Sequence, residues 1–296
     1  MKVTPLAEAG ARPRRVAVGT FDGVHLGHRE VIRGSDTVLT FDPHPLQVIH
    51  PEAVPKLLDS FAIKRDLIAS LGVDEQVVLP FDREFAAQSH DRFVDAVLVE
   101  RLGATHVSVG ENFRFGRAAR GDAEYLRSRP EFETRVVPIV EVEGETVSSS
   151  HIRGLVAAGD VAAAARFLGA PFTLEGEVVA GDRRGRELGM PTANLVPDDR
   201  LAYPGHGVYA ATVDGRPAAV NVGVRPTFES GRGVLIEAHL IDFDDDLYGR
   251  TIRIAFLARL RGERRFESVE ALVDQMHADV ADARRILSAA ASVSRP

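Results

Sequence analysis

Residues 16–28 read Val-Ala-Val-Gly-Thr-Phe-Asp-Gly-Val-His-Leu-Gly-His, and they set the pattern for the first half of the chain. The apolar run at 16–18 is typical of a short buried strand. The glycines after it permit a tight turn into a helix start, where free N–H groups attract anions. His25 and His28 share one face of the first helical turn and could donate hydrogen bonds to a phosphate chain. The alternative is a pair of surface histidines in a glycine-rich turn.

Four more apolar runs of strand length follow in the first half of the chain. They cover residues 37–41, 76–79, 105–110 and 135–140, with helix-like stretches at 60–71 and 91–102. Strands separated by helices need crossover connections, which produce a parallel sheet covered on both faces. Ligands of such sheets bind beyond the carboxyl ends of the strands.

Polar motifs follow three of these further strands. His44 lies in Phe-Asp-Pro-His-Pro (41–45), and Asn112 lies in Gly-Glu-Asn-Phe-Arg-Phe-Gly (110–116). Ser149, Ser150 and Arg153 follow the last strand, where hydroxyls and a guanidinium can form a phosphate clamp. Each motif also has a structural explanation, namely a proline-stiffened turn, a loop with packed rings or a serine cap. Because all of them follow strands in one direction, we expect them to converge on one edge.

Short β-rich runs dominate after about residue 170. They cover 174–179, 207–213, 218–222, 234–241 and 252–260. Closely spaced strands with turns between them predict an antiparallel barrel or sandwich. A closing helix is expected to begin after Ser268 as N-cap, because apolar residues recur at helical spacing as far as Leu287. Gly169-Ala170-Pro171 is the expected linker.

A glycine- and arginine-rich loop runs from Gly181 past Gly189 and ends in Pro-Thr-Ala-Asn. Backbone N–H groups of such a loop can cradle phosphates. The Thr192 hydroxyl and the Asn194 carbonyl are hard oxygen donors of the kind that Mg²⁺ prefers. The alternative is a long hairpin loop with a solvated basic face.

Glu237 lies in the apolar run that we expect to form the strand at 234–241. Alternation along a strand puts Glu237 and His239 on the same face. A carboxylate at that position can act as a general base. Its structural alternative is an outward-facing charge.

Composition narrows the class of protein. The length of 296 residues suggests about two domains, and the net charge of −7 argues against bulk electrostatic binding of nucleic acid. The chain has no cysteine, so disulfides, thiol nucleophiles and iron–sulfur clusters are excluded. We find no apolar run long enough to span a membrane and no signal-peptide pattern. We therefore expect a cytoplasmic protein that acts on small molecules, and self-association stays open.

Taken together, these motifs resemble the bifunctional bacterial riboflavin kinase/FAD synthetase family along nearly the whole chain. The residues that carry the resemblance are 21–28, 40–45, 110–116, 148–153, 189–195, 221–228, 237–243, 260–261 and 266–268. The resemblance implies an α/β Rossmann-like FMN adenylyltransferase domain over 13–170. It also implies an antiparallel β-barrel riboflavin kinase domain over 171–291, with a C-terminal helix. Such enzymes phosphorylate riboflavin with ATP to FMN and then adenylylate FMN to FAD, with Mg²⁺ in both steps.

The resemblance also implies roles for individual residues. His25 and His28 would stabilise the ATP phosphates, and Glu237 would take the proton of the ribityl 5′-hydroxyl. His44 and Asn112 would lie along the flavin, and Thr192 and Asn194 would hold Mg²⁺. The residues implied to bind ATP or its phosphates are Gly19, Phe21, Gly27, Ser149, Ser150, Arg153, Gly181, Gly189, Thr192 and Asn194.

One feature departs from the family pattern, because only residues 29–36 separate His28 from the second strand. A helix that short cannot be stable alone. We therefore expect a mobile turn at 25–28 and an adenylyl transfer weaker than the kinase step, unless neighbouring segments or ATP hold the turn. Two alternatives follow: a riboflavin kinase with a weakened first domain, or a non-catalytic flavin-binding protein.

Overall fold

The computed structural model describes residues 1–180, 190–227 and 231–293. The chain divides into two compact units, of which the first comprises Met1–Pro55 and Lys64–Ser149. The second comprises Lys56–Ile63 and Ser150–Pro296. Residues 150–170 thus group with the second unit, and the functional division at residue 170 stays a prediction.

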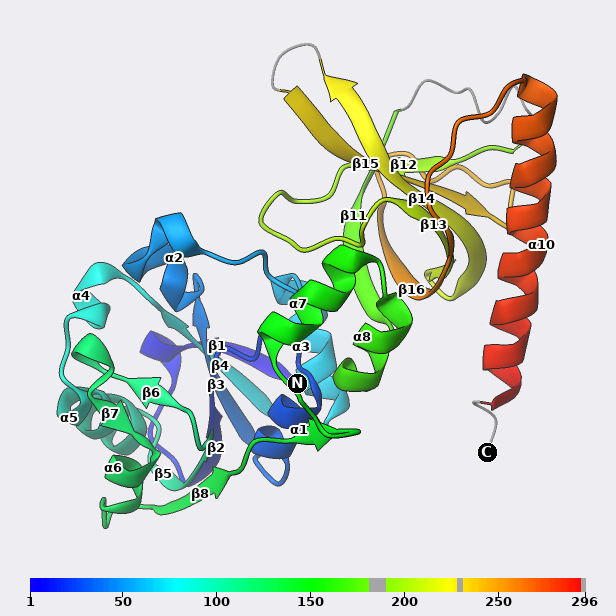
Figure 1. The fold of residues 1–296 in the computed structure, drawn as a ribbon. Helices are drawn as coiled ribbons and strands as arrows, with labels where there is room; N and C mark the ends of the chain where they lie inside the picture. The colour runs from blue at the N-terminus through cyan, green and yellow to red at the C-terminus, as the bar shows by residue number, and fades with distance from the viewer. Residues whose placement is uncertain (181–189, 228–230, 294–296) are drawn as a thin grey trace. The chain divides into compact units, whose positions relative to one another are not determined.

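A six-stranded parallel sheet forms the centre of the first unit (Figure 1). Its strands, in spatial order, are β1 (Lys2–Pro5), β4 (Glu75–Pro80), β3 (Thr37–Asp42), β2 (Arg14–Val18), β5 (Ala104–Gly110) and β8 (Glu133–Val137). The predicted parallel α/β architecture is therefore confirmed. The last strand ends at Val137, three residues earlier than the predicted end at residue 140. It ends there because Pro138 has no N–H to donate to a neighbouring strand.

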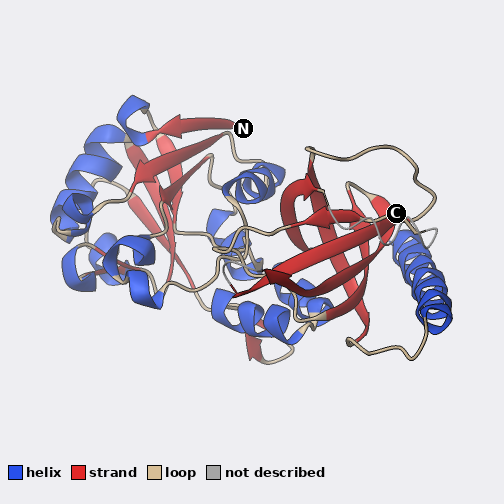
Figure 2. Ribbon diagram, turned by 90° about the horizontal axis from the view of Figure 1, so that it is seen from above, coloured by secondary structure: helices blue, strands red, loops and turns tan. Residues whose placement is uncertain are grey.

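Helices cover both faces of this sheet, and Figure 2 shows them on either side of the strands. One face packs on α1 (Leu26–Ile32) and α3 (Phe61–Ser70) through a buried cluster that includes Val31, Ile32 and Ile68. The other face packs on the π-helical segment η3 (Phe93–Arg101) and on α6 (Ala123–Arg127). The shorter elements are η1 (Leu6–Glu8), α2 (Pro45–Ile49), η2 (Pro51–Ala53), α4 (Arg83–Ala86), α5 (His90–Arg92), η4 (Arg117–Ala119), β6 (Arg114–Phe115), β7 (Gly121–Asp122), β9 (Glu141–Val142) and β10 (Glu145–Thr146).

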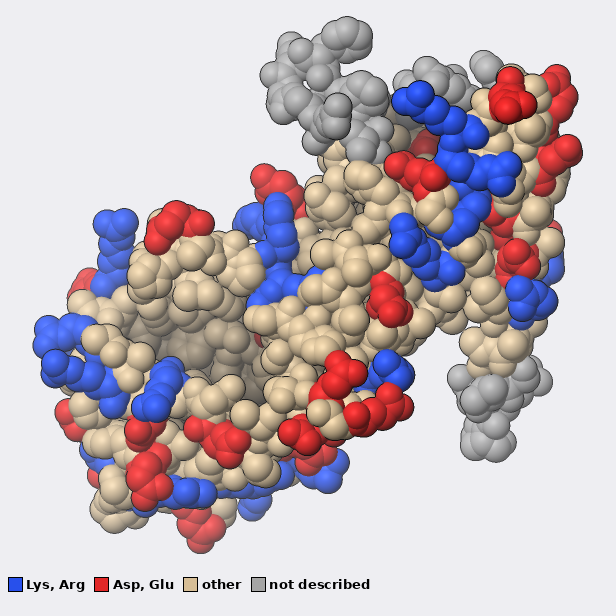
Figure 3. Space-filling model, viewed as in Figure 1, with Lys and Arg blue, Asp and Glu red and all other residues tan. Residues whose placement is uncertain are grey.

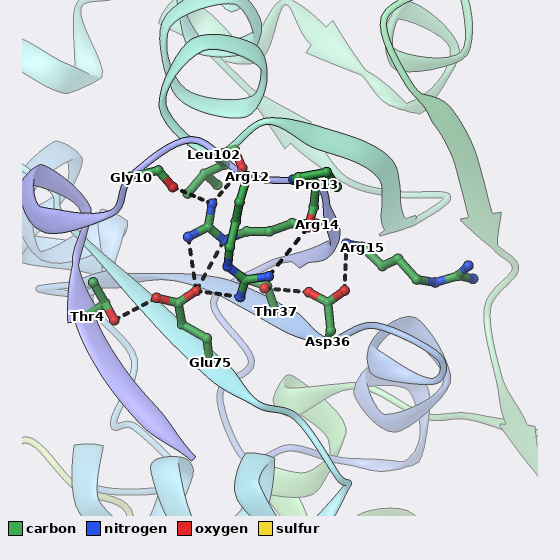
Figure 4. Close-up of polar contacts among 10 residues, drawn as sticks. All are labelled: Thr4, Gly10, Arg12, Pro13, Arg14, Arg15, Asp36, Thr37, Glu75 and Leu102. Carbon is green, nitrogen blue, oxygen red and sulfur yellow. Dashed lines mark hydrogen bonds and ion pairs between the residues drawn. The ribbon is translucent and has the colours of Figure 1, made fainter.

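Edge strand β1, which the sequence pattern did not predict, is held by a buried carboxylate (Figure 4). Glu75 accepts hydrogen bonds from Thr4 at 2.7 Å and from the guanidinium groups of Arg12 and Arg14 at 3.0 and 3.1 Å. Burial raises the pKa of the Glu75 carboxyl, but these three donors outweigh burial and hold the pKa below its ordinary value.

The second unit is a closed antiparallel barrel of six strands. In spatial order they are β11 (Phe172–Val179), β12 (Ala193–Leu195), β15 (Gly231–Leu240), β14 (Arg216–Thr227), β13 (Gly207–Val213) and β16 (Thr251–Arg261). The predicted barrel is confirmed, and the short β12 is a strand that the sequence pattern missed. Closure leaves no free sheet edge.

Helices precede and follow the barrel strands along the chain. Before the barrel come α7 (Ser149–Ala158) and α8 (Val161–Leu168), and Gly169 ends α8 in a left-handed conformation at the predicted linker. After it comes α10 (Val269–Val293), whose N–H of Ala271 bonds to the Ser268 hydroxyl at 3.1 Å, as predicted. Acidic and basic side chains are interspersed over the face of the two units drawn in Figure 3.

Candidate active sites

The loop after β2 carries the first predicted site, and its backbone is unusual. Phe21, Gly23 and Val24 all have positive φ, which L side chains rarely adopt. A side chain at Gly19 would put its Cβ 3.0 Å from the Phe21 ring, so a glycine is needed there. Phe21 is buried in the core with only 1% of its surface exposed, so its contact with ATP stays a prediction.

His25 and His28 lie against each other at the start of α1. His25 is the N-cap, and its Nδ1 accepts the backbone N–H of His28 at 3.2 Å. The two imidazole rings stack with centroids 3.5 Å apart and an interplanar angle of 15°. A Cβ at Gly27 would lie 3.2 Å from Cε1 of His25, so Gly27 leaves room for that ring. The predicted proximity of the two histidines is confirmed.

His28 is kept neutral by its surroundings. Burial lowers its pKa well below the ordinary value, and the neighbouring His25 and the Lys64 cation lower it further. Nδ1 of His28 is buried and has no hydrogen-bond partner among the described residues. A buried polar atom without a partner is costly, and such atoms are tolerated at functional sites. His28 is therefore a neutral imidazole with unused hydrogen-bonding capacity.

Lys64 is a residue at this site that the sequence analysis missed. It lies in the first turn of α3 and is 7% exposed, although lysine is seldom buried. It precedes Ile68, which packs in the same cluster as Val24 and Val31, by one helical turn. A cation in the first turn of a helix opposes the helix dipole. The available signal was a lysine on the apolar face of the helix expected at 60–71.

Ser149 is brought to the histidine loop, as the sequence predicted. Its hydroxyl donates to the backbone carbonyl of Asp22 at 2.9 Å. Ser150 and Arg153 belong to the second unit, where the Arg153 guanidinium donates to the Ser150 hydroxyl at 3.2 Å.

His44 and Asn112 take local roles in the structure. His44 caps α2, with Nδ1 accepting the N–H of Leu46 at 3.2 Å. Asn112 is exposed in the turn after β5, in which the N–H of Phe113 bonds to the carbonyl of Gly110 at 3.0 Å. Their contact with flavin stays a prediction.

In the barrel, three polar side chains form a row across adjacent strands. Asn194 on β12 is paired with Glu237 on β15, which in turn is paired with Asn221 on β14. Directly paired residues project from the same face of a sheet. Nδ2 of Asn221 donates to the Glu237 carboxylate at 3.2 Å. Asn221 was not among the predicted site residues, because pairing between strands is invisible in the sequence.

Asn194, at one end of this row, also lines a cavity of about 460 Å³. Its lining residues are Val178, Pro191, Thr192, Ala193, Asn194, Leu240, Phe243, Asp244, Asp245, Asp246, Leu247 and Tyr248. The predicted Thr192 and Asn194 thus share a cavity with an acidic run that the sequence analysis did not single out. The predicted Gly181 and Gly189 lie outside the described residues.

This cavity suits a hard cation that also binds substrate. In the described part of the chain, no three His, Asp or Glu side chains form a ready metal cluster. Mg²⁺ commonly takes one or two protein oxygens and completes its shell with water and substrate phosphates. The Thr192 hydroxyl and the Asn194 amide oxygen fit that pattern.

Comparisons with known proteins match a different family model in each half of the chain. Residues 8–151 match the family model described as FAD synthetase, and residues 168–287 match the one described as riboflavin kinase. A bifunctional riboflavin kinase/FMN adenylyltransferase of Pseudomonas fluorescens is 37% identical over 93% of both chains. Enzymes of that name from Escherichia coli K12 and Bacillus subtilis are 36% and 34% identical, over 91% and 92% of both chains.

A solved structure is similar along the same length. A crystal structure from Streptococcus pneumoniae, described as a macrolide-efflux protein, superposes with a TM-score of 0.86 at 33% identity. The match covers 96% of this chain and 99% of that chain. Within residues 1–180, 190–227 and 231–293, no helix combines the length and apolar character needed to cross a membrane.

Proposed function

This chain belongs to the bifunctional riboflavin kinase/FMN adenylyltransferase family, and we propose how its two units divide the reactions. It is a transferase with both activities. The barrel transfers the γ-phosphoryl group of ATP to riboflavin, giving FMN and ADP. The first unit joins FMN to the adenylyl group of a second ATP, giving FAD and pyrophosphate. Full-length similarity to bifunctional relatives disfavours a monofunctional kinase and a non-catalytic protein.

For adenylyl transfer we assign His25 and His28 to the ATP phosphates. A phosphate oxygen of FMN attacks the α-phosphorus, and the bond to the pyrophosphate leaving group breaks, so negative charge accumulates on the leaving oxygens. Because Nδ1 of His25 accepts a hydrogen bond, its ring proton belongs on Nε2, from which it can be donated. Neutral His28 supplies one further ring N–H. Donors fixed in place before reaction stabilise such charge most effectively.

For phosphoryl transfer we assign Glu237 as the general base. Its carboxylate takes the proton from the 5′-hydroxyl of riboflavin as that oxygen attacks the γ-phosphorus of ATP, and ADP leaves. The hydrogen bond from Asn221 holds one carboxylate oxygen and leaves the other for the substrate. Such transfers depend on positioning and charge neutralisation, for which a fixed side chain on a strand is well suited.

We assign Thr192 and Asn194 to Mg²⁺, with its substrate phosphates in the adjoining cavity. When bound, the ion would neutralise phosphate charge and orient the triphosphate. Both reactions use small soluble substrates, and we place the enzyme in the cytoplasm, with neither nucleic acid nor membrane as partner.

The observation that carries the kinase assignment is the row Asn194–Glu237–Asn221, whose member Asn194 also lines the cavity. The test is a time course with purified protein, riboflavin, ATP and Mg²⁺, in which chromatography separates FMN from FAD. FMN should appear first and FAD after a lag, and FMN supplied directly should yield FAD without one. FAD formation from riboflavin with no FMN detectable at any enzyme concentration would contradict two separate sites.

A further inference from the structure

Side chains from three neighbouring strands donate hydrogen bonds to backbone carbonyls at the C-terminal end of helix α1. The Ser108 hydroxyl on β5 donates to the carbonyl of Val31 at 2.7 Å. Nη1 of Arg135 on β8 donates to the carbonyl of Arg33 at 2.8 Å, and Nε of Arg15 on β2 donates to that of Gly34 at 2.8 Å. Three strands that are adjacent in the sheet thus hold one helix end.

The sheet register explains how three distant residues meet there. Ser108 is paired with Ala17 on one side and with Arg135 on the other. Arg15 precedes Ala17 by two residues and therefore lies on the same sheet face. That face is the one on which α1 packs, because Ala17 shares a buried cluster with Val31 of the helix.

The helix needs these bonds because it is short. Its seven residues make about two turns, and a helix of this length is not stable in isolation. The last carbonyls of a helix have no partner within it, and cations near that end interact favourably with the helix dipole. The two arginines supply both donors and positive charge. Among the described residues, neither Arg15 nor Arg135 forms an ion pair with a carboxylate.

The other end of the same helix carries the catalytic pair proposed above. His25 caps α1 and His28 stands in its first turn, so any tilt of this short helix moves both rings. We infer that Arg15, Ser108 and Arg135 are positioning residues of FMN adenylyl transfer, which set the place of the two histidines by fixing the far end of α1. This inference rests on the proposed role of the histidines. It supports the alternative in which neighbouring segments, rather than ATP, hold the short helix.

The test compares Arg135→Gln with Arg135→Lys in the full-length enzyme. Arg135→Gln should lower kcat for FMN adenylylation by about ten- to a hundredfold, because misplacement of about 1 Å can cost a hundredfold. The KM for ATP should change much less, and riboflavin phosphorylation should keep its rate. Arg135→Lys should recover part of the loss, since an ammonium group can still donate to the Arg33 carbonyl. Amide hydrogen exchange over residues 25–34 should be faster in Arg135→Gln than in the unaltered enzyme.

Glu133→Gln is the matched control, because Glu133 lies on β8 two residues before Arg135 and contacts His106 rather than α1. It should leave both activities unchanged. His28→Ala is assayed alongside to separate the two ideas. If His28→Ala loses FAD synthesis while Arg135→Gln keeps it, the inference is wrong and the proposed function stands. If His28→Ala keeps full FAD synthesis, the proposed site itself is wrong, and the inference fails with it. An equal loss of both activities in Arg135→Gln, with a lower melting temperature, would show a merely structural role and also overturn it.

Discussion

Replacing Glu237 by glutamine tests the division of the two reactions most directly. The substitution keeps the size of the side chain and an oxygen that can accept the bond from Asn221, which spans 3.2 Å in the structure. It removes the negative charge and with it the ability to take a proton. The row of side chains across β12, β15 and β14 should therefore persist while its basic member is lost.

The expected effect follows from the role of a general base. Loss of such a group costs about 10²–10⁴ in rate. At 1.36 kcal/mol per factor of ten, this corresponds to about 2.7–5.4 kcal/mol of transition-state free energy. The loss should appear in kcat for riboflavin phosphorylation. The rate of FAD formation from added FMN should stay near that of the unaltered enzyme, since Glu237 and the histidine pair lie in different compact units.

The assay follows FMN formed from riboflavin and FAD formed from FMN in separate reactions of one preparation. Glu177→Gln is the matched control, because Glu177 is an exposed strand glutamate on β11 of the same barrel. It should leave both rates unchanged. A fall of both activities by the same factor in Glu237→Gln would refute the two-site reasoning. A kinase rate within threefold of the original would refute the role of general base.

Three further predictions concern the histidines, the cation and the edge strand. Replacing both His25 and His28 by alanine should abolish FAD synthesis and leave the kinase activity intact. Each single replacement should cost about 2.7–4 kcal/mol of transition-state stabilisation, and the cost of the double replacement should be smaller than the sum of the two. Rate assays of the single and double variants measure these costs. Thr192→Ala should raise the Mg²⁺ concentration needed for half-maximal kinase rate, and an unchanged titration curve would exclude the hydroxyl as a ligand. Glu75→Gln should destabilise the first unit by about 3–5 kcal/mol, because it leaves the buried Arg14 cation without its carboxylate. The pKa of Glu75 is lower in the folded protein than in the unfolded chain, so this stabilisation is complete above the unfolded pKa and is lost as the pH falls through the folded pKa. The free energies of unfolding of the unaltered protein and of Glu75→Gln, measured by urea titration, should therefore converge at low pH.

The sequence determined the layout of the two units, because strand and helix periodicity is local. Apolar runs and turn residues located five of the six parallel strands, five of the six barrel strands and the closing helix. The same local reading placed His25 and His28 at the start of a helix, and it placed Ser268 at the N-cap of the closing helix α10. The sequence pattern did not predict strands β1 and β12. With four and three residues, they are too short to show a pattern.

Tertiary structure decided which residues meet. The row of Asn194, Glu237 and Asn221 depends on the register of three strands, and a shift of one residue would turn each side chain to the opposite face. Lys64 is buried near His28, and side chains of β2, β5 and β8 donate hydrogen bonds to the end of α1. These contacts join segments that are far apart in the chain. Periodicity reports which face of an element is apolar, but it carries no information on which element packs against that face. That choice is made by the packing of the whole sheet, so the charge state of His28 and the support of its helix could be learned from the folded chain alone.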